Sequence, residues 1–202
     1  MWIDSMPFGE LVESSTILDA AFYARPAVTV ARDLLGKVIV HGPAAGRIVE
    51  VEAYLGLDDG AAHASAGLTE RTRVLFGPPG HAYVYLIYGI HECLNFVAEP
   101  DGTPGCVLVR ALEPLCGIEG MRARRPAARR IEDLCSGPGK LTAAMGITRA
   151  LNGASVTAGN FVVRRPRRAG RFKIVTSERI GITKCRDWPL RFYLAGNPFV
   201  SR

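Results

Sequence analysis

The sequence is poor in the signals that mark secreted, membrane-spanning and metal-dependent proteins. Its five cysteines are odd in number and form no Cys-x-x-Cys pair, so they indicate neither a disulfide framework nor a zinc site. Its four histidines include no His-Glu-x-x-His arrangement. No apolar run reaches the roughly 18 residues of a bilayer-spanning helix, and acidic residues stand where a signal peptide would be basic. We therefore expect a protein that is not secreted, has no membrane contact, and uses neither metal nor cofactor.

Lysine is also scarce. Only four of the 25 basic residues are lysines, the formal net charge is +6 and the pI is near 9.3. Arginine binds phosphate through a bidentate fork, so the arginine excess suits a polyanionic partner, although a GC-rich genome would produce the same bias. We interpret the arginine-rich run at 122–130 as a solvated basic face and the run at 164–171 as a turn between two strands.

Length and patterning predict one domain over residues 1–202. The chain is 48% hydrophobic and 22% charged, which allows a sizeable core. Residues 1–24 are loosely patterned apart from a short helix expected around Leu18–Ala24, whereas Pro26 begins a helix with an apolar stripe that Gly36 ends. Helices and strands mix without a βαβ alternation, which predicts an α+β fold around a largely antiparallel sheet with surrounding helices.

The stretch from Gly46 to Leu112 contains the residues of most chemical interest, and it begins with a strand. From residue 48 to 55, apolar residues alternate with Glu50, Glu52 and Tyr54. Because strand side chains alternate faces, the two carboxylates and the tyrosine project from one face, and the apolar set packs on the core. The apolar set is Val49, Val51, Ala53 and Leu55. An ordinary solvent-exposed strand face would show the same alternation, so this pattern alone leaves both interpretations open.

A long segment, residues 56–80, has no periodicity and is rich in Gly, Asp, Thr and Pro. A loop of this length inside a compact domain is usually functional or disordered. It carries His63 and is flanked by predicted strands, so we interpret it as a binding loop, although a lone loop histidine is more often merely solvated.

Tyrosines dominate the next predicted hairpin. In the strand 82–87, Tyr83 and Tyr85 share one face, and we interpret Tyr83 as a core residue. Tyr88 precedes a glycine that allows a bend before the strand 91–98, which places this tyrosine at the tip of the corner.

Arg110 lies in an otherwise apolar strand, Cys106–Leu112. Burying an unpaired guanidinium costs several kcal/mol, roughly, so this side chain needs a carboxylate or a phosphate, or must reach solvent. Glu52 on a neighbouring strand is one possible partner, and a ligand phosphate is another.

The sequence Ser136–Leu141, SGPGKL, predicts a capped helix start, with the helix running to Met145. Leu134 stands where a Walker A motif needs its first glycine, which argues against nucleoside triphosphate binding. Free backbone N–H groups beside Lys140 make this start a candidate contact for a DNA backbone phosphate.

Six segments together resemble, in order and spacing, the alkyladenine (3-methyladenine, methylpurine) DNA glycosylase family. They are RIVEVEAYLG, AAH, YVYLIYGIHECLN, VLVRALEP, LCSGPGKL and RFYLAGNPFVS, within a match from about Pro26 to Ser201. The resemblance implies a single mixed domain around a curved antiparallel sheet, without metal or cofactor. It implies a base-excision repair enzyme that hydrolyses the N-glycosidic bond of flipped-out alkylated or deaminated purines. Damaged double-stranded DNA is then the partner, in the bacterial cytoplasm with the nucleoid or in a nucleus, and we expect a monomer.

The resemblance also implies roles for residues at the reacting bond. Glu52 matches the general base that activates water, and Arg110 matches the arginine that works beside it on the water and the DNA backbone. The backbone at Ile180 matches a carbonyl that helps to hold the water. Because no lysine lies in the stretch from Gly46 to Leu112, we predict no Schiff base and no strand cleavage.

Other matched residues concern base recognition. Tyr54, His63 and Tyr85 match the pocket that sandwiches and hydrogen-bonds the extruded base. Tyr88 matches the wedge that fills the gap left in the duplex, and Asn95 matches the side chain that opposes the 2-amino group of guanine.

One stretch departs from the family pattern, and two alternative functions stay open. The sequence TERTR at 69–73 stands where a Thr-Pro-Arg-Asn-like sequence is expected, so we do not carry over the family's loop conformation and base preference to this stretch. A nucleoside or sugar hydrolase could also use Glu50 and Glu52, but it would need neither the arginine excess nor a wedge tyrosine. A non-catalytic DNA or RNA binder would share the basic composition.

Overall fold

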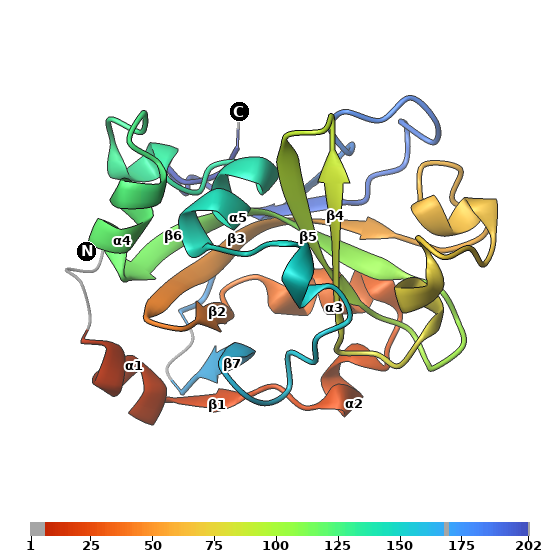
Figure 1. Ribbon diagram of the computed structural model, residues 1–202. Helices are drawn as coiled ribbons and strands as arrows, with labels where there is room; N and C mark the ends of the chain where they lie inside the picture. Colours follow the sequence, from red (N-terminus) through yellow and green to blue (C-terminus); the bar gives the residue numbers. More distant parts are fainter. Residues whose placement is uncertain (1–6, 168–169, 202) are drawn as a thin grey trace.

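The computed structural model describes residues 7–167 and 170–201. Within these residues nine strands form one sheet, and every pair of neighbours is antiparallel. The main path is β1-β7-β2-β3-β6-β5-β4, and β9 joins it by pairing with both β3 and β8 (Figure 1). The strands are β1 (Ser15–Ile17), β2 (Val38–His41), β3 (Ala44–Tyr54), β4 (Ala82–Ile87), β5 (His91–Val97), β6 (Cys106–Cys116), β7 (Phe161–Pro166), β8 (Ile174–Ser177) and β9 (Arg191–Leu194).

Short helices surround this sheet, which confirms the predicted α+β class. They are α1 (Phe8–Glu13), α2 (Ala20–Tyr23), α3 (Ala27–Leu34), α4 (Ile118–Arg124) and α5 (Pro138–Met145), with 3-10 turns η1 (His63–Ala66), η2 (Arg73–Phe76), η3 (Ile131–Asp133) and η4 (Arg149–Leu151). α3 packs against β3 and β6, and α5 packs against β5 and β6. None of the helices in the described part of the chain combines the length and the apolar character that crossing a bilayer requires.

Helix α3 forms where the apolar stripe predicted it. Pro26 stands at its N-cap, and Val30, Ala31 and Leu34 are fully buried against the sheet. Gly36 follows with a φ of 81°, a conformation that favours glycine, and a Cβ there would lie 2.9 Å from the Phe172 ring. The helix therefore ends at a position where both the backbone and the neighbouring ring require glycine.

Strand β3 is buried on both faces, because Glu50 and Glu52 are as fully buried as the apolar residues between them. The interpretation of the Glu50 face as solvent-exposed is therefore wrong. β6 covers one edge along most of its length, while β2 and then β9 pair with the other edge. The register with β6 shifts around Glu50, and such bulges re-aim side chains. The apolar set is buried as predicted except Leu55, which lies just past the strand end and is 37% exposed.

Hairpin β4–β5 turns at Tyr88, as the glycine after it predicted. Tyr88 itself has a φ of 53°, uncommon for a residue with a side chain, and it is 82% exposed. The tip of this hairpin points to the top of Figure 1, away from the core. The turn therefore holds an aromatic ring in solvent at the end of a two-stranded arm.

Two other predictions need correction or restriction. Helix α5 begins as predicted, but its N-cap is Gly137 and no side chain caps it, so the cap expected from Ser136 is absent. Within residues 7–24, α1 and β1 form in addition to the predicted helix. The predictions for residues 1–24 and 164–171 also cover residues 1–6 and 168–169, which lie outside the described residues.

Candidate active site

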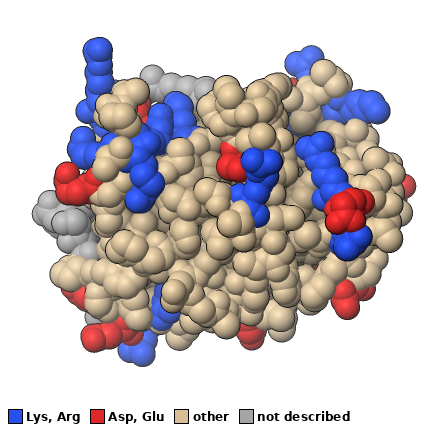
Figure 2. Space-filling model, in the orientation of Figure 1, with Lys and Arg blue, Asp and Glu red and all other residues tan. Residues whose placement is uncertain are grey.

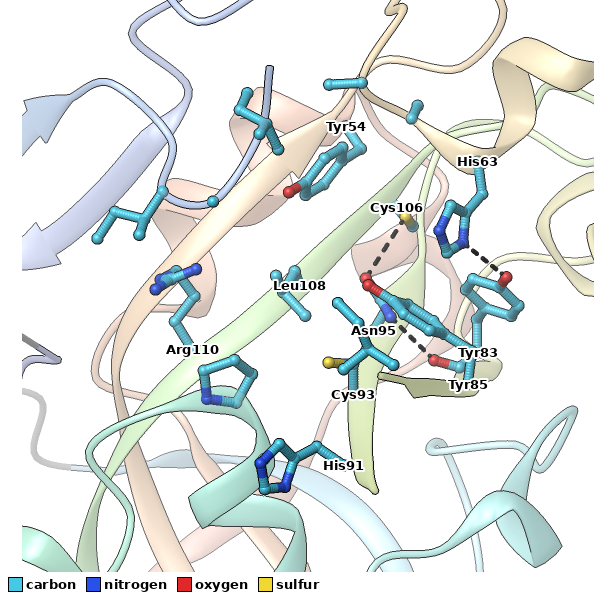
Figure 3. Close-up of a pocket in the computed structure, with 18 of the residues that line it drawn as sticks. Tyr54, His63, Tyr83, Tyr85, His91, Cys93, Asn95, Cys106, Leu108 and Arg110 are labelled. Carbon is cyan, nitrogen blue, oxygen red and sulfur yellow. Dashed lines mark hydrogen bonds between the residues drawn. The ribbon is translucent and has the colours of Figure 1, made fainter. Parts of the chain in front are cut away.

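A cavity of about 660 Å³ opens between the sheet, the 56–80 loop, the start of α5 and residues 180–182 (Figure 3). Eight of the predicted site residues line it, namely Tyr54, His63, Tyr85, Tyr88, Asn95, Arg110, Lys140 and Ile180. Glu52 is not among the lining residues, because it is fully buried. It lies directly behind the cavity wall, bonded to three groups that form that wall.

Two hydrogen bonds and one ion pair hold the Glu52 carboxylate. The Tyr54 hydroxyl donates to Oε2 at 2.9 Å, and the Ile180 N–H donates to Oε1 at 2.8 Å. Arg110 Nη1 lies 3.2 Å from the same Oε1. The contact that the structure records for Ile180 is made by its amide, and the water-holding role of its carbonyl stays a prediction. The ion pair with Arg110 confirms one of the two partners predicted for that arginine.

Glu50 is the second buried carboxylate, and it accepts more contacts than Glu52. Its Oε1 lies 2.9 Å from Arg110 Nε and 2.7 Å from Arg191 Nε. Ser201 donates its N–H to Oε2 at 2.7 Å and its hydroxyl to Oε1 at 2.9 Å. Glu50 therefore fixes one edge of the Arg110 guanidinium, and the other edge faces Glu52. Sequence reasoning missed this arrangement, because Arg191 and Ser201 lie 81 and 91 residues from Arg110 along the chain.

Burial raises the pKa of Glu52 above its ordinary value. Arg110, the Ile180 amide and the Tyr54 hydroxyl each lower that pKa, while the neighbouring Glu50 raises it, and burial outweighs the donors. A carboxylate with a raised pKa binds a proton more readily than an exposed one. Glu52 is thus better suited to accept a proton than a glutamate in water.

A second buried ion pair supports this wall. Arg179 and Asp59 are both fully buried as side chains, with Arg179 Nη2 2.8 Å from Asp59 Oδ1. Although burial alone would raise it, the hydrogen bonds from Arg179 lower the pKa of Asp59. The guanidinium also donates to the Ala53 carbonyl at 3.1 Å and lies 4.6 Å from the centroid of the Tyr54 ring. Because Ile180 is its chain neighbour, Arg179 positions both the ring and the amide that bind Glu52.

Aromatic rings form the opposite wall, as Figure 3 shows. The rings of His63 and Tyr85 lie 4.5 Å apart between centroids, and Tyr83 lies 5.3 Å from Tyr85. His63 Nδ1 is 2.9 Å from the Tyr83 hydroxyl. Burial, and then the charge of Arg71, lower the pKa of His63. Tyr83 is buried as predicted, but it also lines the cavity, so its role extends beyond the core.

Asn95 is buried at the floor of the cavity with its amide held at both ends. Nδ2 donates to the Tyr83 carbonyl at 3.1 Å, and the Cys106 thiol contacts Oδ1 at 3.8 Å. Burial raises the pKa of Cys106 to about 12, so the thiol keeps the proton that it donates. The orientation of the amide is therefore fixed before any ligand enters.

The mouth of the cavity combines exposed apolar and basic side chains. Tyr88 is 82% exposed and Ile90 is 73% exposed, both at the hairpin tip, and the exposed Lys140 lies at the start of α5. Figure 2, in the orientation of Figure 1, shows Lys and Arg side chains mainly across the upper half of the face, toward which the hairpin tip points. The cavity mouth therefore suits a polyanionic ligand that contains stacked aromatic rings.

Comparisons with known proteins agree on one family. The model of the family described as Methylpurine-DNA glycosylase (MPG) matches residues 21–198. A protein of Methanoculleus marisnigri is 54% identical over 191 residues, covering 92% of this chain and 98% of its own length. Proteins of Koribacter versatilis and Legionella pneumophila are 48% and 43% identical, and cover 97% and 92% of this chain and 98% of their own lengths. All three carry the provisional name 3-methyladenine DNA glycosylase.

Proposed function

The chain belongs to the methylpurine-DNA glycosylase family, and we propose that it excises alkylated and deaminated purines that have been rotated out of duplex DNA. Membership makes it a DNA-3-methyladenine glycosylase, which is a hydrolase of N-glycosyl bonds with DNA as its substrate. The lesions we propose are 3-methyladenine, 7-methylguanine, hypoxanthine and ethenoadenine. The enzyme acts as a monomer on chromosomal DNA, in the bacterial cytoplasm or in a nucleus.

The rings of Tyr54, His63 and Tyr85 line a part of the cavity that we call the aromatic slot. The observation that carries the proposal is the Glu52 carboxylate held directly behind this slot. Glu52 acts as the general base: the oxygen of a water bonds to C1′ of the sugar, the bond from C1′ to the purine nitrogen breaks, and Glu52 takes the proton of the water. The purine leaves with the bonding electrons. An alkylated, cationic base then departs as a neutral molecule, whereas hypoxanthine or ethenoadenine departs as an anion that takes up a proton from solvent water. Because the Tyr54 hydroxyl now occupies Oε2, water reaches the carboxylate when that hydrogen bond opens.

Arg110 and Ile180 orient the reacting groups. Arg110 is held by Glu50 and faces Glu52, so its charge lies beside the attacking water and the adjoining DNA backbone. The Ile180 amide fixes Oε1, and the Ile180 carbonyl helps to hold the water. Oε2 then takes the proton once the Tyr54 hydroxyl has moved away. Lys140, exposed at the start of α5, binds a backbone phosphate at the cavity mouth.

Base rotation uses the exposed hairpin tip. Extracting a nucleotide costs a few kcal/mol of stacking, roughly, and an aromatic contact to a base returns about 1–3 kcal/mol. Tyr88 enters the gap in the duplex, while Tyr54, His63 and Tyr85 surround the extruded base. Asn95, whose amide is fixed, opposes the 2-amino group of an undamaged guanine.

Glu52→Gln tests the mechanism directly. We expect this variant to bind lesion-containing duplex but to release base about a thousandfold more slowly than wild type in single-turnover assays, because general bases contribute about 10²- to 10⁴-fold. Glu113→Gln is a matched control, since Glu113 is also buried but pairs with Arg47 and does not line the cavity. Unchanged excision by Glu52→Gln would refute the mechanism.

The same assay separates the alternative functions. Duplex oligonucleotides with one defined lesion each are incubated with enzyme, and the free base and the intact abasic strand are quantified. Equal activity on free nucleosides would identify a nucleoside hydrolase, and binding without base release would identify a non-catalytic binder. Trapping of an enzyme–DNA adduct by borohydride would contradict a water nucleophile.

A further inference from the structure

Arg71 is an exposed residue whose side chain reaches the aromatic wall from outside the cavity. It belongs to the loop stretch 69–73, and it is not among the residues that line the cavity. Thr72 fixes the turn around it, because the Thr72 hydroxyl donates to the Gly67 carbonyl at 2.8 Å. The guanidinium carbon of Arg71 lies 5.6 Å from the centroid of the Tyr85 ring. A cation is thus fixed against one ring of the slot before any base enters.

The same guanidinium also acts on the Tyr83 hydroxyl. Burial raises the pKa of Tyr83, and a hydrogen bond from Arg71 together with its charge lowers it. The Tyr83 hydroxyl in turn lies 2.9 Å from His63 Nδ1. The charge of Arg71 therefore acts on Tyr85 and on His63, which are two of the residues that surround the base.

We propose that Arg71 is a specificity-determining residue that makes this wall electropositive and shifts excision from cationic alkylpurines toward neutral lesions. The inference rests on the proposed function of the cavity. A purine methylated at N3 or N7 is a cation, whereas hypoxanthine and ethenoadenine are neutral. A ring that already has a guanidinium against it stabilises a second cation less, and the two positive charges repel. Neutral bases keep their stacking on Tyr85 without that repulsion.

Arg71→Gln tests this role, with Arg73→Gln as the matched control. Arg73 lies two residues away, is exposed and pairs with Glu70, and it lines no part of the cavity. Single-turnover excision is measured on duplexes that carry 7-methylguanine or hypoxanthine, with the enzyme-free loss of 7-methylguanine subtracted. We expect Arg71→Gln to raise the ratio of the 7-methylguanine rate to the hypoxanthine rate about fivefold, the size of one exposed cation–π contact. Arg73→Gln leaves this ratio unchanged.

Nitrogen NMR of the histidine rings supplies a readout that a merely structural role would not move. The groups that face His63 from the described elements are Tyr83 and Tyr85 of β4 and Arg71 of the loop. With the cation removed, the pKa of His63 should rise toward its ordinary value in Arg71→Gln and stay low in Arg73→Gln.

Two results would overturn the proposal. Equal losses on both lesions would make Arg71 a contact of the DNA backbone, and an unchanged ratio with an unchanged histidine titration would leave it without influence on the slot. Both differ from failure of the proposed function, in which wild-type protein would release neither base.

Discussion

The two walls of the cavity are built in opposite ways. On the carboxylate wall, Glu50 and Glu52 are fully buried, Arg110 is 8% exposed, and each carboxylate binds several donors. On the aromatic wall, the rings of His63 and Tyr85 contact one another. That wall continues along hairpin β4–β5 to exposed side chains at the mouth.

This difference separates two tasks. The carboxylate wall is held by β3, β6 and β9 and by Ser201, which lie far apart in sequence, so its geometry is set by the whole fold. A reacting group must be held within a fraction of an ångström, and buried networks provide that precision. The aromatic wall is held mostly by local contacts, and ring stacking tolerates bases of different shape. Changes in the first wall should therefore affect folding and chemistry together, and changes in the second should affect recognition.

Glu50→Gln should cause the largest combined effect. Breaking a buried ion pair costs about 3–5 kcal/mol of unfolding free energy, and Glu50 anchors both Arg110 and Arg191. Excision should also fall about 100-fold, since misplacing a catalytic group by about 1 Å has that effect. Urea unfolding and single-turnover excision measure the two losses.

Glu113→Gln sharpens this first test, because it breaks a different buried ion pair on the same sheet, with Arg47. It should lose stability while keeping excision. If both glutamate variants lost stability and excision in equal proportion, Glu50 would be a structural residue and the carboxylate wall would have no special role.

The same contrast decides what could be predicted from the sequence. Local patterns predicted α3, the β4–β5 hairpin and the cluster of Glu52, Tyr54 and Arg110, because alternation and helical stripes are properties of short segments. The burial of Glu50 was not predictable, since it depends on β9 and Ser201 returning from the C-terminal end.

Longer-range support was missed for the same physical reason. Arg179 and Asp59 lie 120 residues apart, and nothing in either local sequence indicates that they form a buried pair. The effect of Arg71 on Tyr85 depends on the path of a loop without periodicity. Partners of this kind appear only when the chain has folded.

Tyr88→Ala should have a smaller effect, which is confined to DNA binding and excision and leaves stability unchanged. The ring is 82% exposed, so its removal should change the unfolding free energy by less than about 0.5 kcal/mol. Loss of one stacking contact should weaken lesion-duplex binding and slow excision about tenfold. Leu68→Ala is the control, because Leu68 is 67% exposed and does not line the cavity. A drop in stability, or wild-type binding, would remove Tyr88 from the proposed mechanism.

Tyr54→Phe should cause the smallest change, which is a shift in the pH dependence of excision. Tyr54 connects the two walls, because its hydroxyl binds Glu52 and its ring lines the cavity. Excision requires ionised Glu52, so the rate should fall as the pH drops through a pKa that burial has raised above that of an exposed glutamate. The Tyr54 hydrogen bond lowers this pKa, so its loss should move the acid limb to higher pH. Tyr23→Phe is the control, since the buried Tyr23 hydroxyl has no hydrogen-bond partner among the described residues. An acid limb that stays in place in Tyr54→Phe would mean that a group other than Glu52 controls the rate, and that the aromatic slot and the carboxylate wall work independently.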